Sequence, residues 1–167
     1  MAKAFRFSLR AEEADITELD LGRDLYDVVI LNQLLFHLPN WETTFETLDK
    51  AWDATKVGGH IWVRTPGKED EEYEKFRTMA EYGQGIETDE DTFLGMCACT
   101  GEMRPEPFLF LDQTALLQYF CLKGARIIHS QIIPRFGVKN VMYGKDWQNE
   151  EGEYKQNGML TILAQKK

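Results

Sequence analysis

Three polar side chains follow a continuous apolar run near the N-terminus, and they are the first candidates for chemistry. Asn32 and Gln33 come directly after the run Val28 to Leu31, and His37 follows four residues later. Open α/β sheets bind ligands at the carboxyl ends of their strands, and a histidine can act as a base near neutral pH. Two plainer interpretations stay open: amides that satisfy backbone groups at a strand-to-helix joint, and a hydrogen-bonded structural histidine.

Further candidates lie at the end of a second apolar stretch and in a polar connector. Arg64 and Thr65 close the stretch His60 to Thr65 and could contact a substrate, although an arginine at this place could equally be an ion-pair partner. Asp15 lies in the connector that precedes the first run, where it could also cap a turn.

A strand, a helix and a second strand are expected to position these residues. A continuous apolar run suits a strand buried on both faces, as in the middle of a parallel sheet. After Asn40, a plausible N-cap, one stripe of an amphipathic helix follows and Gly58-Gly59 ends it; the stripe is Trp41, Phe45, Leu48 and Trp52. With His60 to Thr65 as the next strand, these elements predict a parallel βαβ unit in which Trp52 and Trp62 are core residues.

The rest of the chain predicts fewer and looser elements. An alternating strand is expected at Phe5 to Ala11, and no long periodic element is expected between Gln84 and Phe110, where a binding loop or lid would fit. The other expected elements are a helix over "DEEYEKFRTMAEYG", a helix from Asp112 to Gly124, a strand over "ARIIHSQIIP" and a last strand at Gly158 to Ala164.

The composition indicates one soluble globular domain. The 167 residues are 43% hydrophobic and 28% charged, with a net charge of −9. This charge argues against a nucleic-acid partner, no apolar run is long enough to span a membrane, and with no secretory signal visible the cytoplasm is the expected compartment. The three cysteines are expected to be free thiols and no metal site is expected; they are Cys97, Cys99 and Cys121.

Four stretches, in this order, resemble the C-terminal part of a class I S-adenosylmethionine-dependent methyltransferase. They are "ADITELDLGRDLYDVVILNQLLFHL", "VGGHIWVRTPG", "LLQYFCLKGARII" and "GMLTILAQKK". The resemblance implies an α/β fold: a partial Rossmann-like sheet, mostly parallel with an antiparallel C-terminal strand, and helices on both faces. It also implies S-adenosylmethionine as cofactor, with contacts from Asp15, Ile16, Asn32, Gln33 and His37, and a substrate beside Arg64 and Thr65.

One part of the family pattern is missing. The family holds the cofactor on a glycine-rich turn after its first strand and on an acidic residue after its second. Residues 1–14 contain no glycine, and Glu12 and Glu13 are not in the position of that acid. We therefore expect residues 1–167 to form a single methyltransferase-like domain that lacks the N-terminal glycine-rich unit and binds the cofactor weakly or not at all.

The missing unit leaves the run Val28 to Leu31 with an unpaired edge, which is an aggregation hazard. Three covers are possible: the segment Phe5 to Ala11, a second copy of the chain, or another polypeptide that carries the glycine-rich half. A homodimer is favoured among them. Two functions stay open, an enzyme completed by a partner or by upstream sequence, and a non-catalytic binding or regulatory subunit.

Overall fold

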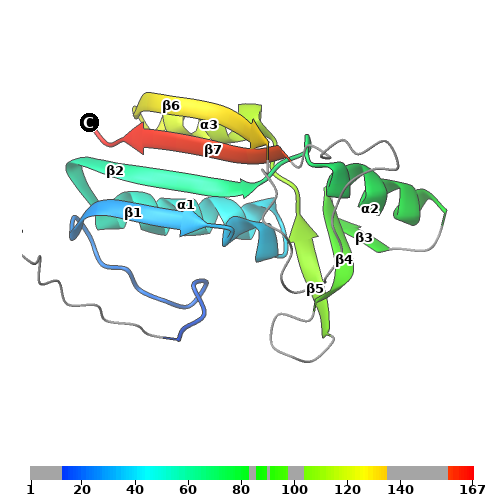
Figure 1. The fold of residues 1–167 in the computed structure, drawn as a ribbon. Coiled ribbons are helices and arrows are strands. Elements are labelled where there is room, and N and C mark those ends of the chain that lie inside the picture. The colour runs from blue at the N-terminus through cyan, green and yellow to red at the C-terminus, as the bar shows by residue number, and fades with distance from the viewer. Residues whose placement is uncertain (1–12, 83–85, 90, 98–103, 135–157) are drawn as a thin grey trace, which may run out of the picture.

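A four-stranded sheet forms the frame of the structure (Figure 1). The computed structural model describes residues 13–82, 86–89, 91–97, 104–134 and 158–167. The strands, in their order across the sheet, are β1 (Tyr26–Asn32), β2 (Thr55–Pro66), β7 (Gly158–Gln165) and β6 (Arg126–Pro134). β1 and β2 are parallel and β7 is antiparallel to both neighbours. The predicted α/β class is confirmed, with a mixed sheet in place of a mostly parallel one.

Two helices cover one face of this sheet. α1 (Trp41–Ala54) and α3 (Gln113–Leu122) share a single core with β2 and β7. The expected caps are present: Asn40 Oδ1 accepts from the Thr43 amide at 2.9 Å, and Asp112 Oδ1 from the Ala115 amide at 3.0 Å. The sequence predicted helices on both faces, but no described helix covers the other face (Figure 1).

The first helix ends earlier than Gly58-Gly59. It stops at Ala54 because β2 begins at the next residue. Lys166, just past the end of β7, donates its Nζ to the carbonyls of Trp52 and Thr55 at 3.0 and 2.7 Å. A lysine at this place satisfies carbonyls that a helix end leaves without partners. The last residues of the chain therefore fix the start of β2.

A second, smaller unit combines the helix predicted over "DEEYEKFRTMAEYG" with three strands between Gln84 and Phe110, where the sequence predicted no long periodic element. It contains η1 (Leu35–His37), α2 (Glu71–Glu81) and an antiparallel sheet of β3 (Ile86–Asp89), β4 (Thr92–Cys97) and β5 (Arg104–Leu109). A cluster of phenylalanines is its core: Phe36, Phe93, Phe108 and Phe110. A Cβ added to Gly95 would lie only 2.4 Å from the ring of Phe108, so this glycine permits the close packing of β4 on β5.

A buried carboxylate ties the smaller unit to the end of β2. The Tyr73 hydroxyl donates to Asp91 Oδ1 at 2.8 Å, and Lys68, just past β2, forms an ion pair with the same carboxylate. Burial, and then the bond to Asp91, raise the pKa of Tyr73 to about 12. The hydroxyl is therefore a stable donor across the physiological pH range.

The expectation that Val28 to Leu31 is buried on both faces is wrong. Leu31 packs in the core, but Val28 and Ile30 are 53% and 55% exposed. Strand side chains alternate between faces, and the described residues cover only the face on which α1 lies. The segment Phe5 to Ala11, one of the three possible covers, lies outside the described residues.

The expectation that Trp62 is a core residue is also wrong. Its neighbours Ile61 and Val63 are fully buried against the helices, whereas Trp62 points to the open face and is 36% exposed. Trp52, on α1, is 9% exposed and belongs to the main core. Among the helices in the described part of the chain, none is long and apolar enough to cross a membrane.

The two tryptophans make a matched pair for a stability test. We expect Trp52→Ala to lower the free energy of unfolding by about 3–5 kcal/mol, as for a large buried aromatic. Trp62→Ala should cost clearly less, about 1–2 kcal/mol, because this side chain keeps much of its surface in water. Denaturant titration at constant m-value measures both, and an equal loss in the two variants would contradict the assignment of Trp62 to the open face.

Candidate functional site

Two predicted site residues meet where the parallel strands β1 and β2 end. Asn32 and Arg64 are paired in the register of the two strands, so their side chains lie on the same face of the sheet. The Gln33 amide donates to the Arg64 carbonyl at 2.6 Å. This edge is the place where open α/β sheets bind ligands.

Gln33 has a backbone conformation that is uncommon for a residue with a side chain. Its φ is +57°, in the left-handed region. The conformation turns the chain out of β1 and into η1, which begins two residues later. Such residues are concentrated at binding and catalytic sites, where the surrounding structure holds them.

Arg64 and Thr65 point to opposite faces of β2. Thr65 shares the helix-covered face with Val63 and is fully buried, and its hydroxyl has no hydrogen-bond partner among the described residues. The Nε atom of Arg64 is likewise buried and without a partner there, although the residue as a whole is half-buried. Arg64 can therefore meet a ligand on the open face, whereas a contact from Thr65 would require a rearrangement. Its substrate role stays a prediction.

His37 has an acidic partner that sequence reasoning missed. Its Nδ1 lies 3.6 Å from Glu106 Oε2 on β5, and both side chains are partly exposed. The imidazole also meets the rings of Phe36 and Phe108 edge-on, with centroids 5.3 and 5.7 Å away. A carboxylate beside one ring nitrogen can orient the imidazole and leave the other nitrogen for a ligand. The alternation of Pro105 and Pro107 around Glu106 was the available signal for an edge strand.

Asp15 and Ile16 lie on another element, the connector that leads to β1. The Asp15 carboxylate accepts from the Thr17 amide at 2.8 Å and from the Thr17 hydroxyl at 2.7 Å. These bonds, first the one from the hydroxyl, lower the pKa of Asp15 below its usual value. Lys50 on α1 donates to the carbonyls of Ile16 and Thr17, and the Ile16 side chain packs on the main core. Asp15 therefore caps a turn, which was the plainer of its two interpretations.

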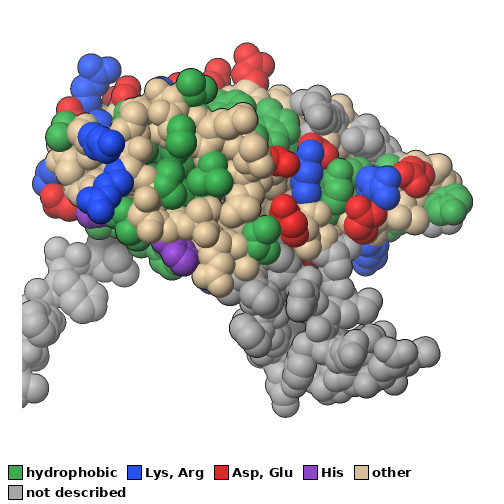
Figure 2. Space-filling view, turned by 90° about the horizontal axis from the view of Figure 1, so that it is seen from above, with side chains coloured by type: hydrophobic (Ala, Val, Ile, Leu, Met, Phe, Trp, Pro, Cys, Tyr) green, Lys and Arg blue, Asp and Glu red, His purple; other side chains and the backbone are tan. Residues whose placement is uncertain are grey.

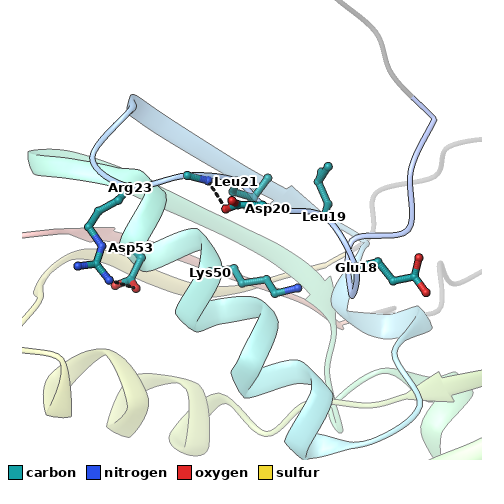
Figure 3. A pocket seen from close by; sticks show the side chains of 8 residues that line it. Glu18, Leu19, Asp20, Leu21, Arg23, Lys50 and Asp53 are labelled. Carbon is teal, nitrogen blue, oxygen red and sulfur yellow. Dashed lines mark hydrogen bonds and ion pairs between the residues drawn. The ribbon is translucent and has the colours of Figure 1, made fainter.

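The connector also borders a hollow of about 460 Å³ beside α1. Figure 3 shows the side chains of Lys50 and Asp53 on the helix facing the connector segment 18–23, where Arg23 pairs with Asp53 at 3.5 Å. None of the seven predicted site residues lines this hollow. It is therefore separate from the edge where Asn32 and Arg64 meet.

The described residues do not by themselves fit S-adenosylmethionine. The connector before β1 holds one glycine, Gly22, and no glycine-rich turn, and Gly67 after β2 is packed against the Leu111 carbonyl. Asp15 is engaged with Thr17. In the same part of the chain, no group of three or more His, Cys, Asp or Glu side chains could hold a metal. Cys99, one of the three cysteines, lies outside the residues that the structure describes.

Comparison by sequence finds no matching protein-family model and no matching curated protein. Comparison by structure does find similar proteins. A methyltransferase from Methanosarcina mazei, described as S-adenosylmethionine-dependent, is 16% identical with a TM-score of 0.61; the match covers 92% of this chain and 65% of that one. A methyltransferase from Listeria monocytogenes, described in the same way, is 17% identical with a TM-score of 0.56, over 99% of this chain and 72% of that one.

A third neighbour comes from a complex between the Trm112 methyltransferase activator of Haloferax volcanii and a methyltransferase. It is 14% identical with a TM-score of 0.53, and the match covers 91% of this chain and 59% of that one. The chain thus spans less than two thirds of the first and third of these proteins. Each of the three matches nevertheless covers more than nine tenths of this chain. The chain has the fold of a class I S-adenosylmethionine-dependent methyltransferase.

Proposed function

We propose that this chain is the substrate-side part of an S-adenosylmethionine-dependent methyltransferase, incomplete as a catalyst alone. A partner chain or upstream sequence would carry the glycine-rich unit and complete the cofactor site. The observation that carries the proposal is the bare outer edge of β1, at which the sheet of the described residues stops. Two neighbours of the same fold have about a third of their length or more without counterpart here, and no glycine precedes Asp15.

The residues at the carboxyl edge receive separate roles in this proposal. Asn32 and Gln33 contact the cofactor, and His37, held by Glu106, lies beside the cofactor or its reacting partner. Arg64 faces the substrate, since the register of β1 and β2 places its side chain on the open face beside Asn32. Thr65 would contact the substrate only if a rearrangement exposed its buried side chain. These roles rest on the adjacency of the two strand ends and on the left-handed Gln33.

The connector contributes the adenine contact, from Asp15 with Ile16. Asp15 would have to exchange at least part of its bonding to Thr17 for the adenine amino group. Because the carboxylate is exposed to solvent and its turn is local, this exchange does not disturb the core.

A second function, a non-catalytic binding or regulatory subunit, is favoured by one observation. Asp15 is the predicted cofactor residue with a carboxylate before β1, and this carboxylate already accepts two hydrogen bonds from Thr17. A chain that kept the fold but lost the cofactor would look the same. The partner would then be the ligand, as the complex of the Haloferax methyltransferase with its activator illustrates for another protein.

The surface charge bears on the partners of either function. Figure 2 shows one face of the molecule, on which many Lys and Arg side chains lie beside Asp and Glu side chains rather than in one continuous basic area. Together with the net charge of −9, this supports a protein or small-molecule partner rather than nucleic acid. We place the protein in the cytoplasm.

The isolated chain should bind S-adenosylmethionine poorly. We expect a dissociation constant no better than about 1 mM, equivalent to about 4 kcal/mol, because the glycine turn and the ribose-binding acid are missing. Calorimetric titration of the purified chain measures it, with injection into buffer as the control. Micromolar binding would contradict the incomplete site and show that other residues supply those contacts.

The bonding of Asp15 can be tested separately by NMR titration. We expect the pKa of Asp15 to lie below the usual value for an Asp and to rise in Thr17→Ala, which removes the hydroxyl that lowers it most. Thr17→Ser, which keeps the hydroxyl, is the matched control. Because the pKa is depressed in the folded state, the ionised carboxylate stabilises the turn at pH values above the usual pKa of an Asp. This stabilisation is lost as the pH falls through the depressed pKa. An unchanged pKa in Thr17→Ala would mean that another group holds the carboxylate.

A further inference from the structure

The exposed apolar side chains of this chain are concentrated at one strand. Of the nine large hydrophobic side chains that are exposed among the described residues, four belong to β1 and the residue before it: Leu25, Tyr26, Val28 and Ile30. Trp62 continues the patch on β2, where it is paired with Ile30. Farther along the open face, β2 carries Lys56, His60 and Arg64, and β7 carries Leu163 opposite Trp62 between the polar Thr161 and Gln165. The exposed apolar surface of this face is therefore concentrated at the edge strand.

The edge itself has little protection. In the described residues β1 pairs only with β2, and its one irregularity lies between Tyr26 and Val28, so the remainder is a regular strand. The stretch Val28 to Leu31 holds no Lys and no Pro, the residues that usually guard an edge. The last two residues before β1 are tied to the end of α1, because the Asp24 and Leu25 amides donate to the carbonyls of Asp53 and Ala54.

We propose that this edge is an interface between two copies of the chain, with β1 antiparallel to β1 of the second copy and Val29 at the twofold axis. The two sheets would then form one continuous sheet of eight strands. The proposal goes beyond the proposed function: it starts from the same edge of β1 but holds whether or not the chain has a cofactor site.

The backbone geometry selects this register. The Gln33 amide donates to Arg64, so the backbone groups of the odd-numbered residues of β1 face β2, and those of Val28 and Ile30 face outward. A twofold axis perpendicular to the sheet leaves each residue on the same face in both copies. Paired residues must therefore both be even-numbered or both be odd-numbered, because side chains alternate between the faces. When the pairing is centred on Val29, it includes all seven residues from Tyr26 to Asn32. Val28 of each copy then forms a hydrogen-bonded pair with Ile30 of the other copy.

The side chains agree with this register. Val28 meets Ile30 of the second copy on the open face, and the Tyr26 phenol meets the Asn32 amide. Asp27, which is paired with Lys56 at 2.9 Å, lies opposite Leu31 of the second copy rather than opposite a like charge. Val28 to Leu31 is apolar on both faces, so its best match is a strand that is also apolar on both faces. Phe5 to Ala11 alternates with Arg6 and Arg10 and is a poorer match.

The size of the interface sets the expected strength of the dimer. Two seven-residue strands joined at their edges form a contact at the low end of specific interfaces, below about 1,200 Å², where association is weak. Each copy carries a net charge of −9, so the dimer should be stronger at 0.5 M salt than at low salt. We therefore expect a dissociation constant in the micromolar range, roughly 1–100 μM.

Sedimentation of the full chain over a range of concentrations tests the proposal. We expect a monomer–dimer equilibrium that Ile30→Lys weakens by about tenfold or more, because the new lysine lies opposite Val28 and diagonally across from its own copy. Ile128→Lys is the matched control, since Ile128 is similarly exposed but lies on β6 at the far edge of the sheet. A monomer at several hundred micromolar, or a dimer that only Ile128→Lys weakens, would overturn the proposal.

A disulfide test examines the register. In a background with the three native cysteines replaced by serine, Val29→Cys should form a crosslinked dimer on mild oxidation, because residues in a non-hydrogen-bonded pair have Cα atoms about 4.5 Å apart. Asp27→Cys should not, since its two copies would lie about 13 Å apart along the strands. Crosslinking of Asp27→Cys in preference to Val29→Cys would rule this register out.

Discussion

The parallel pairing of β1 with β2 is the constraint on which the rest of the structure depends. Parallel neighbours require a crossover, and α1 supplies it while burying the inner face of both strands. The pairing brings the ends of the two strands together, so that Asn32 and Arg64 become neighbours although 31 residues separate them in the sequence. Every further part of the candidate edge, from the turn at Gln33 to the contact of His37 with Glu106, is built outward from that pair.

Local signals in the sequence predicted most of the larger sheet. Asn40 and Asp112 cap helices where expected, and the helix stripe and the last two strands are in place. The error over Val28 to Leu31 has a physical cause. Four consecutive apolar residues indicate that burial is favourable on both faces of the strand, but they do not indicate whether this chain or a second one supplies the cover. Trp62 was misassigned for the same reason, since alternation along β2 places it on the uncovered face.

The candidate site was harder to predict, because it depends on contacts between distant segments. Glu106 lies 69 residues beyond His37, in a hairpin whose strands are disguised by Gly95 and by two prolines. Thr65 and Arg64 were equal candidates in the sequence, and only the face that each takes in β2 separates them. For Asp15, both interpretations used the same residue, and a hydrogen bond from Thr17 two residues away favours the turn.

The bare edge of β1 links the function of this chain to its assembly. A strand has only one free edge once β2 occupies the other, so a second copy and a completing glycine-rich unit cannot both pair with β1. A unit that restored the cofactor site would therefore displace the second copy, and the apolar patch of Val28, Ile30 and Trp62 would serve whichever partner is bound. In the proposed dimer, which would be the form of the chain without that unit, an identical strand would satisfy the hydrogen-bonding groups of the edge. Because both partners would use the same backbone hydrogen-bonding groups of β1, a chain could either bind the cofactor with the completing unit or pair with a second copy, but not both.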